Sequence, residues 1–192
     1  MSNIPTREEA WALLTEFNKT ERTRKHALAV EAAMRYMARK MDGDENTWGI
    51  VGLIHDLDYE QFPDEHCRKT GQLLEERGWP AELIRAAVSH GWEVCIDVKP
   101  ETDLEKVLYA VDELTGLITA CVLVLPSKNI SDLKLKSVKK KWKSKSFAAG
   151  VDREIIKRGA DMLNLDRDDL ITCVMAGMQE QASALCLAGE SP

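Results

Sequence analysis

Residues 46–56, which read NTWGIVGLIHD, form the stretch of sequence that decides the fold. Apolar residues run through this stretch and lead directly into a histidine and an aspartate, His55 and Asp56. The run predicts a buried helix that carries both polar side chains toward the interior at its end. An ionised aspartate is costly in such a place unless its charge is compensated, and a divalent cation would compensate it well. The alternative is a histidine that only ends the helix, followed by a solvated aspartate.

Helical periodicity continues along nearly the whole chain, and no stretch shows the sustained alternation expected of strands. Thr6 and Thr102, each with a glutamate three residues later, form capping boxes that predict two helix starts. We expect a first helix after Thr6, followed by helices over about 21–41, 46–56, 63–77, 80–90, 102–125, 131–141, 152–163 and 168–187. The prediction is an all-α helical bundle of eight or nine helices. It would form a single domain over residues 1–192, with a core at about 20–165 and the C-terminal helix packed on it.

The composition indicates an ordinary globular protein of 192 residues, with 44% hydrophobic and 30% charged residues. The first residues lack the basic cluster and apolar run expected of a secretory signal. The longest apolar stretch, residues 117–125, falls far short of the roughly 20 residues that cross a membrane. Five cysteines without a Cys-x-x-Cys pair are typical of reduced thiols. We therefore expect a cytoplasmic protein with no membrane partner.

Positive charge is concentrated in one segment of a chain whose net charge is −6. Residues 126–146 contain eight lysines and a single acidic residue, Asp132. Proteins that coat nucleic acid need a broadly basic face, so this distribution argues against nucleic acid as a partner. The basic strip, Lys134 to Lys145 around Trp142, has three interpretations: a solvated helix face, a phosphate-binding rim over a pocket, or a nucleic-acid patch.

Two further polar residues adjoin apolar helix faces. His26 is followed at helical spacing by the apolar residues of a buried stripe, and Asp112 adjoins the apolar face of residues 107–118. A buried histidine is either a core residue with satisfied nitrogens or a metal ligand, and a buried aspartate needs an arginine, a helix cap or a metal. Imidazole and carboxylate donors without thiolate suit Mn, Fe, Co, Ni, Mg or non-structural Zn.

The order of these residues along the chain resembles that in the HD superfamily of metal-dependent phosphohydrolases. In that family four such side chains bind one divalent ion; the matching positions here are His26, His55, Asp56 and Asp112. In the dinuclear branches, which include the HD-GYP phosphodiesterases, two intermediate histidines hold a second ion that the aspartate of the pair bridges. His66 and His90 match those two by order and local context. The alternative is an exposed His66 at a helix start and a His90 that interacts with a helix dipole.

Two short segments resemble the small bacterial-type members of the superfamily: residues 112–116, DELTG, and residues 147–150, FAAG. The whole resemblance covers about residues 20–165. It implies a metal-dependent phosphohydrolase, either a phosphomonoesterase or a phosphodiesterase. Such an enzyme would act on a nucleotide or small phosphate ester through a water activated by one or two divalent ions.

Positive side chains near the expected centre are candidates for binding the substrate's phosphate, because phosphoryl transfer develops negative charge. The three candidates are Arg22, Lys25 and Lys69. A helix continuous from Pro63 would place Lys69 on the same face as His66, three residues earlier.

Asp56 and Asp58 are the candidate catalytic carboxylates. Asp58, two residues after Asp56, could act as a general acid or base, orient a metal ligand, or cap the turn before Pro63. The sequence leaves these three roles open.

Two other functions fit the same residues. The first is a di-iron oxygenase on the same scaffold, because a few oxygenases related to the hydrolases use such a centre. The second is a non-catalytic module that binds a nucleotide as a signal or holds a purely structural metal.

Overall fold

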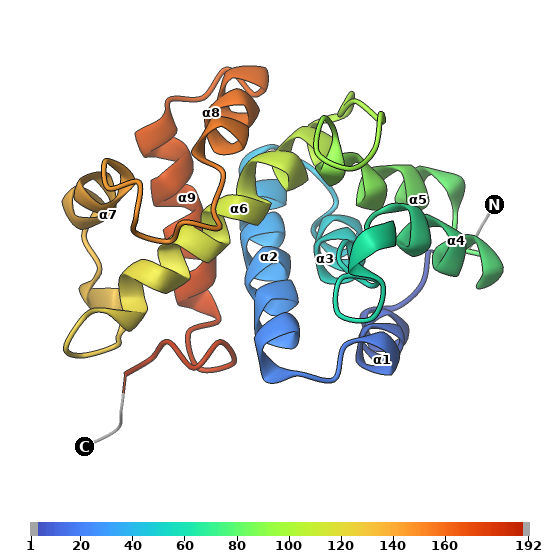
Figure 1. Ribbon diagram of the computed structural model, residues 1–192, viewed down its shortest axis with the longest axis horizontal. Coiled ribbons are helices and arrows are strands. Elements are labelled where there is room, and N and C mark those ends of the chain that lie inside the picture. Colours follow the sequence, from blue (N-terminus) through green and yellow to red (C-terminus); the bar gives the residue numbers. More distant parts are fainter. Residues whose placement is uncertain (1–3, 190–192) are drawn as a thin grey trace.

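The computed structural model describes residues 4–189, which form nine α-helices, three short 3-10 helices and, apart from two isolated bridges, no β-structure (Figure 1). The all-α prediction is therefore confirmed. The expectation of a single domain also covers residues 1–3 and 190–192, which lie outside the described residues. The helices are α1 (Arg7–Phe17), α2 (Glu21–Lys40), α3 (Glu45–Ile54), η1 (Pro63–Glu65), α4 (Arg68–Glu76), α5 (Ala81–Val88), η2 (Ser89–Gly91), α6 (Asp103–Leu123), η3 (Ile130–Asp132), α7 (Leu135–Trp142), α8 (Arg153–Met162) and α9 (Arg167–Glu180).

Both predicted capping boxes are present. The Thr6 side chain accepts a hydrogen bond from the Glu9 backbone N–H, and the Glu9 carboxylate accepts one from the Thr6 N–H at 2.7 Å. Thr102 and Glu105 form the same reciprocal pair at the start of α6. These local signals placed the starts of α1 and α6 correctly because they satisfy N–H groups that a helix leaves free at its first turn.

Three predicted helices are wrong in extent. The helix expected over residues 131–141 is divided into η3 and α7, because Leu133 and Lys134 are extended. The helix expected from Pro63 to residue 77 is interrupted at Cys67, whose φ of 65° lies in the left-handed region, and α4 begins only after it. The helix expected to reach residue 187 ends at Glu180. The chain after it turns back instead, and the Ile130 N–H donates to the Leu187 carbonyl at 2.8 Å. Neither of these last two interruptions carries a local stop signal, since no glycine or proline lies at residues 64–68 or 178–186.

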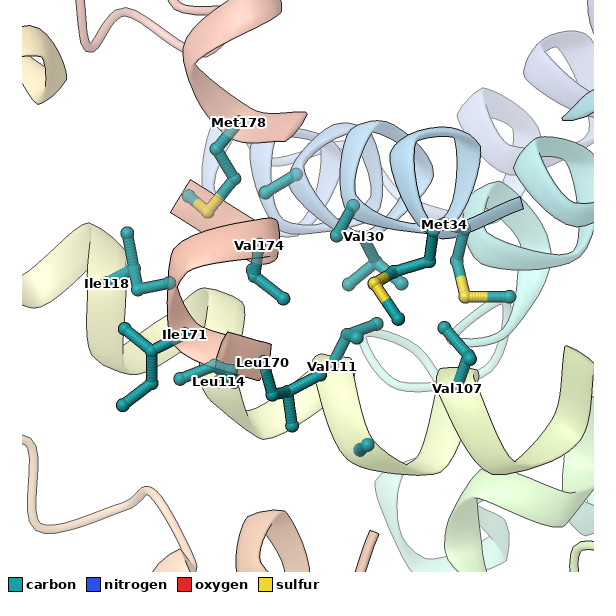
Figure 2. Packing of buried hydrophobic residues seen from close by; sticks show 14 of the residues in the cluster. Val30, Met34, Val107, Val111, Leu114, Ile118, Leu170, Ile171, Val174 and Met178 are labelled. Atoms are coloured by element: carbon teal, nitrogen blue, oxygen red, sulfur yellow. The ribbon is translucent and has the colours of Figure 1, made fainter. Parts of the chain in front are cut away.

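Helix α2 occupies the middle of the fold and packs against α3, α6 and α9 (Figure 1). Figure 2 shows the main core, where Val30 and Met34 of α2 meet Val107 and Val111 of α6, with Val174 of α9 alongside. A second cluster joins α1, α3 and α4 on the other side of α2. Burying such side chains contributes about 1.5–3 kcal/mol each, so the relative placement of α2, α3 and α6 is strongly determined.

Close approach of α2 and α3 depends on Gly52. A β-carbon at this position would lie 2.9 Å from Cγ of Met34 and 3.2 Å from the backbone of Glu31. The missing side chain lets α3 lie directly against α2. This contact brings the end of α3, with His55, beside the N-terminal half of α2, with His26.

The basic strip forms α7 and the turn after it, at the opposite end of the molecule from α4 and α5 (Figure 1). Lys139 pairs with Asp168, and the guanidinium of Arg167 lies 5.1 Å from the ring centre of Trp142. Of the three interpretations of the basic strip, these contacts and this position favour a solvated helix face whose charge is partly neutralised by α9. Within the described part of the chain, none of the helices combines the length and apolarity needed to cross a bilayer.

Candidate metal centre

Six side chains from widely separated segments meet at one place between α2, α3 and α6. They are His26 of α2, His55 at the C-terminal end of α3, Asp56 directly after it, His66 between η1 and α4, His90 of η2 and Asp112 of α6. All six residues singled out by sequence therefore come together in the structure.

Three of these residues and one oxygen of Asp56 form what we call the first half of the centre. Oδ1 of Asp112 lies 3.0 Å from Nε2 of His26 and 3.4 Å from Nε2 of His55. Oδ2 of Asp56 lies 3.6 Å from the same atom of His26 and 3.5 Å from that of His55. Two imidazole nitrogens and two carboxylate oxygens thus face one small space.

The other oxygen of Asp56 and two imidazoles form the second half of the centre. Oδ1 of Asp56 lies 3.3 Å from Nε2 of His90 and 3.6 Å from Nε2 of His66. The two imidazole nitrogens are 3.2 Å apart. Asp56 therefore presents one oxygen to each half, which is the arrangement a bridging carboxylate needs.

Backbone carbonyls hold two of the imidazoles in a defined orientation. Nδ1 of His55 lies 2.8 Å from the carbonyl oxygen of Gly52, and Nδ1 of His90 lies 2.6 Å from that of Ala87. A carbonyl oxygen can only accept, so Nδ1 is the donor in each pair. In the neutral ring, Nε2 then keeps its lone pair and aims it at the centre. Metal-binding histidines characteristically have this arrangement.

Nε2 of His55 is a buried nitrogen without a hydrogen-bond partner among the described residues. The carboxylate oxygens of Asp56 and Asp112 lie 3.5 and 3.4 Å away, too poorly aligned to satisfy it. An unsatisfied buried polar group costs about 1–3 kcal/mol. A cation between the nitrogen and the two oxygens would remove that cost, so the residues present fit a divalent ion.

Asp58 is fully buried, and both of its carboxylate oxygens are engaged. Oδ1 accepts a hydrogen bond from Nδ1 of His66 at 2.8 Å, and Oδ2 accepts one from the backbone N–H of Thr70 at 2.8 Å. Of the roles considered for Asp58, the geometry favours the one that orients His66. A general acid or base would need an oxygen free to reach the substrate.

The carboxylates and imidazoles of the centre perturb one another's pKa values. Burial is the largest influence on each of the four histidines and lowers its pKa, but the neighbouring carboxylates outweigh it and the net shift is upward. Burial alone would raise the pKa values of Asp56 and Asp112, yet contacts with the histidines, foremost His55, hold both well below the usual range. Without a cation, the carboxylates of the centre therefore favour the protonated form of the imidazoles more than water does.

The three candidate phosphate-binding residues differ in their exposure and in the partners of their charged groups. Arg22 is exposed on α2, one turn before His26. Lys25 pairs with Glu21 at 2.8 Å. Lys69 donates to the side chain of Gln72 at 3.3 Å. The expectation that Lys69 shares a helix face with His66 is wrong, because His66 precedes the left-handed residue Cys67 and lies outside α4.

A pair of thiols beside the second half was missed by sequence analysis. Sγ of Cys67 lies 3.7 Å from Nε2 of His90 and 3.1 Å from Sγ of Cys95. The two cysteines are 28 positions apart, and only the adjacency of Cys67 to His66 could have pointed to them.

Asn18, after the end of α1, is a second residue that the sequence did not reveal. Its side chain is buried, and its amide nitrogen donates to the carbonyl oxygens of Leu57, at 3.1 Å, and Asp56, at 3.4 Å. It therefore fixes the backbone turn that follows His55. An asparagine after a helix has too many ordinary uses to be identified from sequence.

Glu113 is an ionisable residue directly after Asp112. Burial, followed by the negative charge of Asp112, raises the pKa of Glu113 to about 7. Its carboxylate accepts a hydrogen bond from the backbone N–H of Asp152, at the start of α8, at 3.1 Å. It links α6 to α8 beside the first half of the centre.

Comparison with known proteins gives one match. The family model described as HD domain matches residues 23–139, a range that contains all six residues of the centre. Neither the curated proteins nor the solved structures include a match to this chain.

Proposed function

The chain belongs to the HD domain family, and we propose that it is a metal-dependent phosphohydrolase that acts on a nucleotide or another small phosphate ester. The observation that carries the proposal is the carboxylate of Asp56, with imidazole nitrogens within 3.3–3.6 Å of each oxygen. The family consists generally of metal-dependent hydrolases, and the imidazole and carboxylate groups that face one another here support such an activity.

The first half of the centre would hold one divalent ion, and the second half would hold another that shares Asp56. Nitrogen and oxygen donors suit Mn, Fe, Co, Ni, Mg or Zn. A bound ion of this kind supplies two things to hydrolysis: it lowers the pKa of water and polarises a phosphoryl oxygen.

The protein's own residues would orient these donors and bind the phosphate. The carbonyls of Gly52 and Ala87 and the carboxylate of Asp58 keep the protons of three imidazoles on Nδ1, away from the centre. Arg22, exposed one turn before His26, is the cation best placed to meet an incoming phosphate. Lys25 and Lys69 would have to leave their present partners to do so.

The test begins with protein stripped by a chelator and reloaded separately with each candidate ion without oxygen. A panel of phosphomonoesters and phosphodiesters should then show turnover that needs the ion and disappears in His55→Ala. Asp64→Ala changes an exposed carboxylate of η1 and serves as the matched control. Turnover that survives both chelation and His55→Ala would refute the proposal. Absence of turnover with every ion under these conditions, together with oxygen consumption by the iron-loaded protein once air is admitted, would replace it with an oxygenase.

A further inference from the structure

We propose that Cys67 and Cys95 form a redox-active pair that closes to a disulfide and weakens ion binding in the second half of the centre. The effect on ion binding rests on the proposed function; formation of the disulfide does not. The pair is distinct from the histidine and aspartate donors of the centre and lies directly beside two of them.

The two thiols are already close to bonding distance. Their sulfur atoms are 3.1 Å apart, and a disulfide bond is about 2.05 Å long, so closure requires an approach of about 1 Å. Cys67 is fully buried, whereas Cys95 is partly exposed on the turn after η2. A soluble oxidant can therefore reach one thiol first, and the second thiol completes the reaction from inside.

Gly91 makes this approach possible. A β-carbon at residue 91 would lie 2.4 Å from Sγ of Cys67 and 2.5 Å from Sγ of Cys95, closer than such atoms can come. The turn is held by hydrogen bonds from the backbone N–H groups of Cys95, at 3.0 Å, and Ile96, at 3.2 Å, to the Gly91 carbonyl. The space that a side chain would fill is the place where the two sulfurs meet.

The bond would join the two segments that supply the second half of the centre. Cys67 directly follows His66, and Cys95 lies five residues after His90. Sγ of Cys67 is also 3.7 Å from Nε2 of His90. Drawing Cys67 toward Cys95 would displace His66 from the position that Asp58 gives it, while His26, His55 and Asp112 lie on other elements and would not move.

A small disulfide such as oxidised glutathione is a sufficient oxidant. The thiolate of Cys95 attacks one glutathione sulfur, breaks its S–S bond and releases one glutathione thiolate, which leaves a mixed disulfide. The thiolate of Cys67 then attacks Sγ of Cys95 and expels the second glutathione. The two protein thiols lose two electrons and two protons, and the oxidant becomes two molecules of reduced glutathione.

The experiment uses the full chain with Cys173→Ser and Cys186→Ser, so that the other accessible thiols do not react. After oxidised glutathione is added, peptide mass spectrometry should find a Cys67–Cys95 crosslink lighter by two hydrogens and no glutathione. Cys67→Ser should stop at a glutathione adduct on Cys95, whereas Cys95→Ser should gain no adduct at its buried Cys67. Cys121→Ser, which removes a buried thiol elsewhere, should form the crosslink unchanged.

Binding of Mn²⁺ to the reduced and crosslinked forms tests the consequence, because Mn²⁺ favours carboxylate oxygen over thiolate. We expect the second equivalent to bind about fivefold or more weakly after crosslinking and the first to be unchanged. Glutathionylated Cys95 without a crosslink would overturn the redox pair. A crosslink with unchanged Mn²⁺ binding would overturn its effect on the centre. A reduced protein that binds neither Mn²⁺ nor any other of the candidate ions would refute the proposed function, and the crosslink would still decide the redox pair.

Discussion

The two halves of the centre are built in different ways. The first half takes His26 from the 20-residue helix α2 and Asp112 from the 21-residue helix α6, both packed in the main core. The second half takes His90 from a three-residue 3-10 helix and His66 from the turn that ends another. Next to His66, Cys67 has a left-handed backbone that costs about 1–3 kcal/mol in a residue other than glycine. Core packing thus fixes the first half, whereas a few hydrogen bonds fix the second, and the second should be the more easily altered.

Asp56→Asn should have the largest effect because this carboxylate faces both halves. We expect loss of both bound ions and of turnover beyond detection, since a neutral amide cannot replace the charge shared between the two sites. Metal content by elemental analysis and turnover of the best phosphate ester are the measurements. Asp64→Asn, at an exposed carboxylate, should match wild type. A variant at Asp56 that keeps two ions would show that the two halves do not share this residue.

A comparison of His55→Ala with His66→Ala should separate the halves. His55→Ala is expected to abolish turnover and ion binding in the first half, because it removes a fully buried donor that the core holds in place. His66→Ala should keep one ion, since the first-half donors remain in position. Elemental analysis, with circular dichroism to confirm folding, distinguishes the outcomes. Equal losses in the two variants would mean that the centre binds its ions as one unit.

Asp58→Asn should have a smaller effect that is confined to the second half. The substitution weakens the hydrogen bond that orients His66 and disturbs the one to Thr70. Losing such an outer partner typically costs about 10- to 100-fold in metal affinity or activity. Titration with Mn²⁺ should show this loss in one equivalent and little change in the other. An unchanged ion affinity combined with a shifted pH profile of kcat would instead favour a general acid or base.

The smallest expected effect is on the free energy of unfolding of the protein after a chelator has removed any bound metal. The histidines have raised folded pKa values, so their contribution is complete below the unfolded value of about 6.5 and is lost as pH rises through the folded values. Asp56 and Asp112 have lowered folded pKa values. Their contribution to the free energy of unfolding is therefore complete above the unfolded value of about 4 and is lost as pH falls through the folded values. The free energy of unfolding in urea should therefore peak between about pH 4 and 6.5 and decline on the alkaline side. Metal-loaded protein should lack this alkaline decline, and a decline of equal size in both forms would contradict the assignment.

The sequence was informative where the signal is local or regular. Capping boxes placed the starts of α1 and α6, and apolar periodicity identified the helices that carry His26 and Asp112. It was uninformative where distant groups decide the backbone. Asp58 binds both His66 and the backbone at the start of α4, on either side of the break at Cys67. A helical pattern that begins at Pro63 shows neither this contact nor the break. The pairing of Cys67 with Cys95 across Gly91 is equally a product of the fold.

Asn18 extends the centre's requirements beyond the segment that the family model matches. The match begins at residue 23, yet the Asn18 amide holds the carbonyls of Asp56 and Leu57 from outside it. A shortened chain that starts at Thr23 would leave these two carbonyls without the Asn18 amide and release the turn that begins at Asp56. The segment after α1 thus supports a site whose residues lie later in the chain. Trimming the polypeptide to the segment that the family model matches would remove that support.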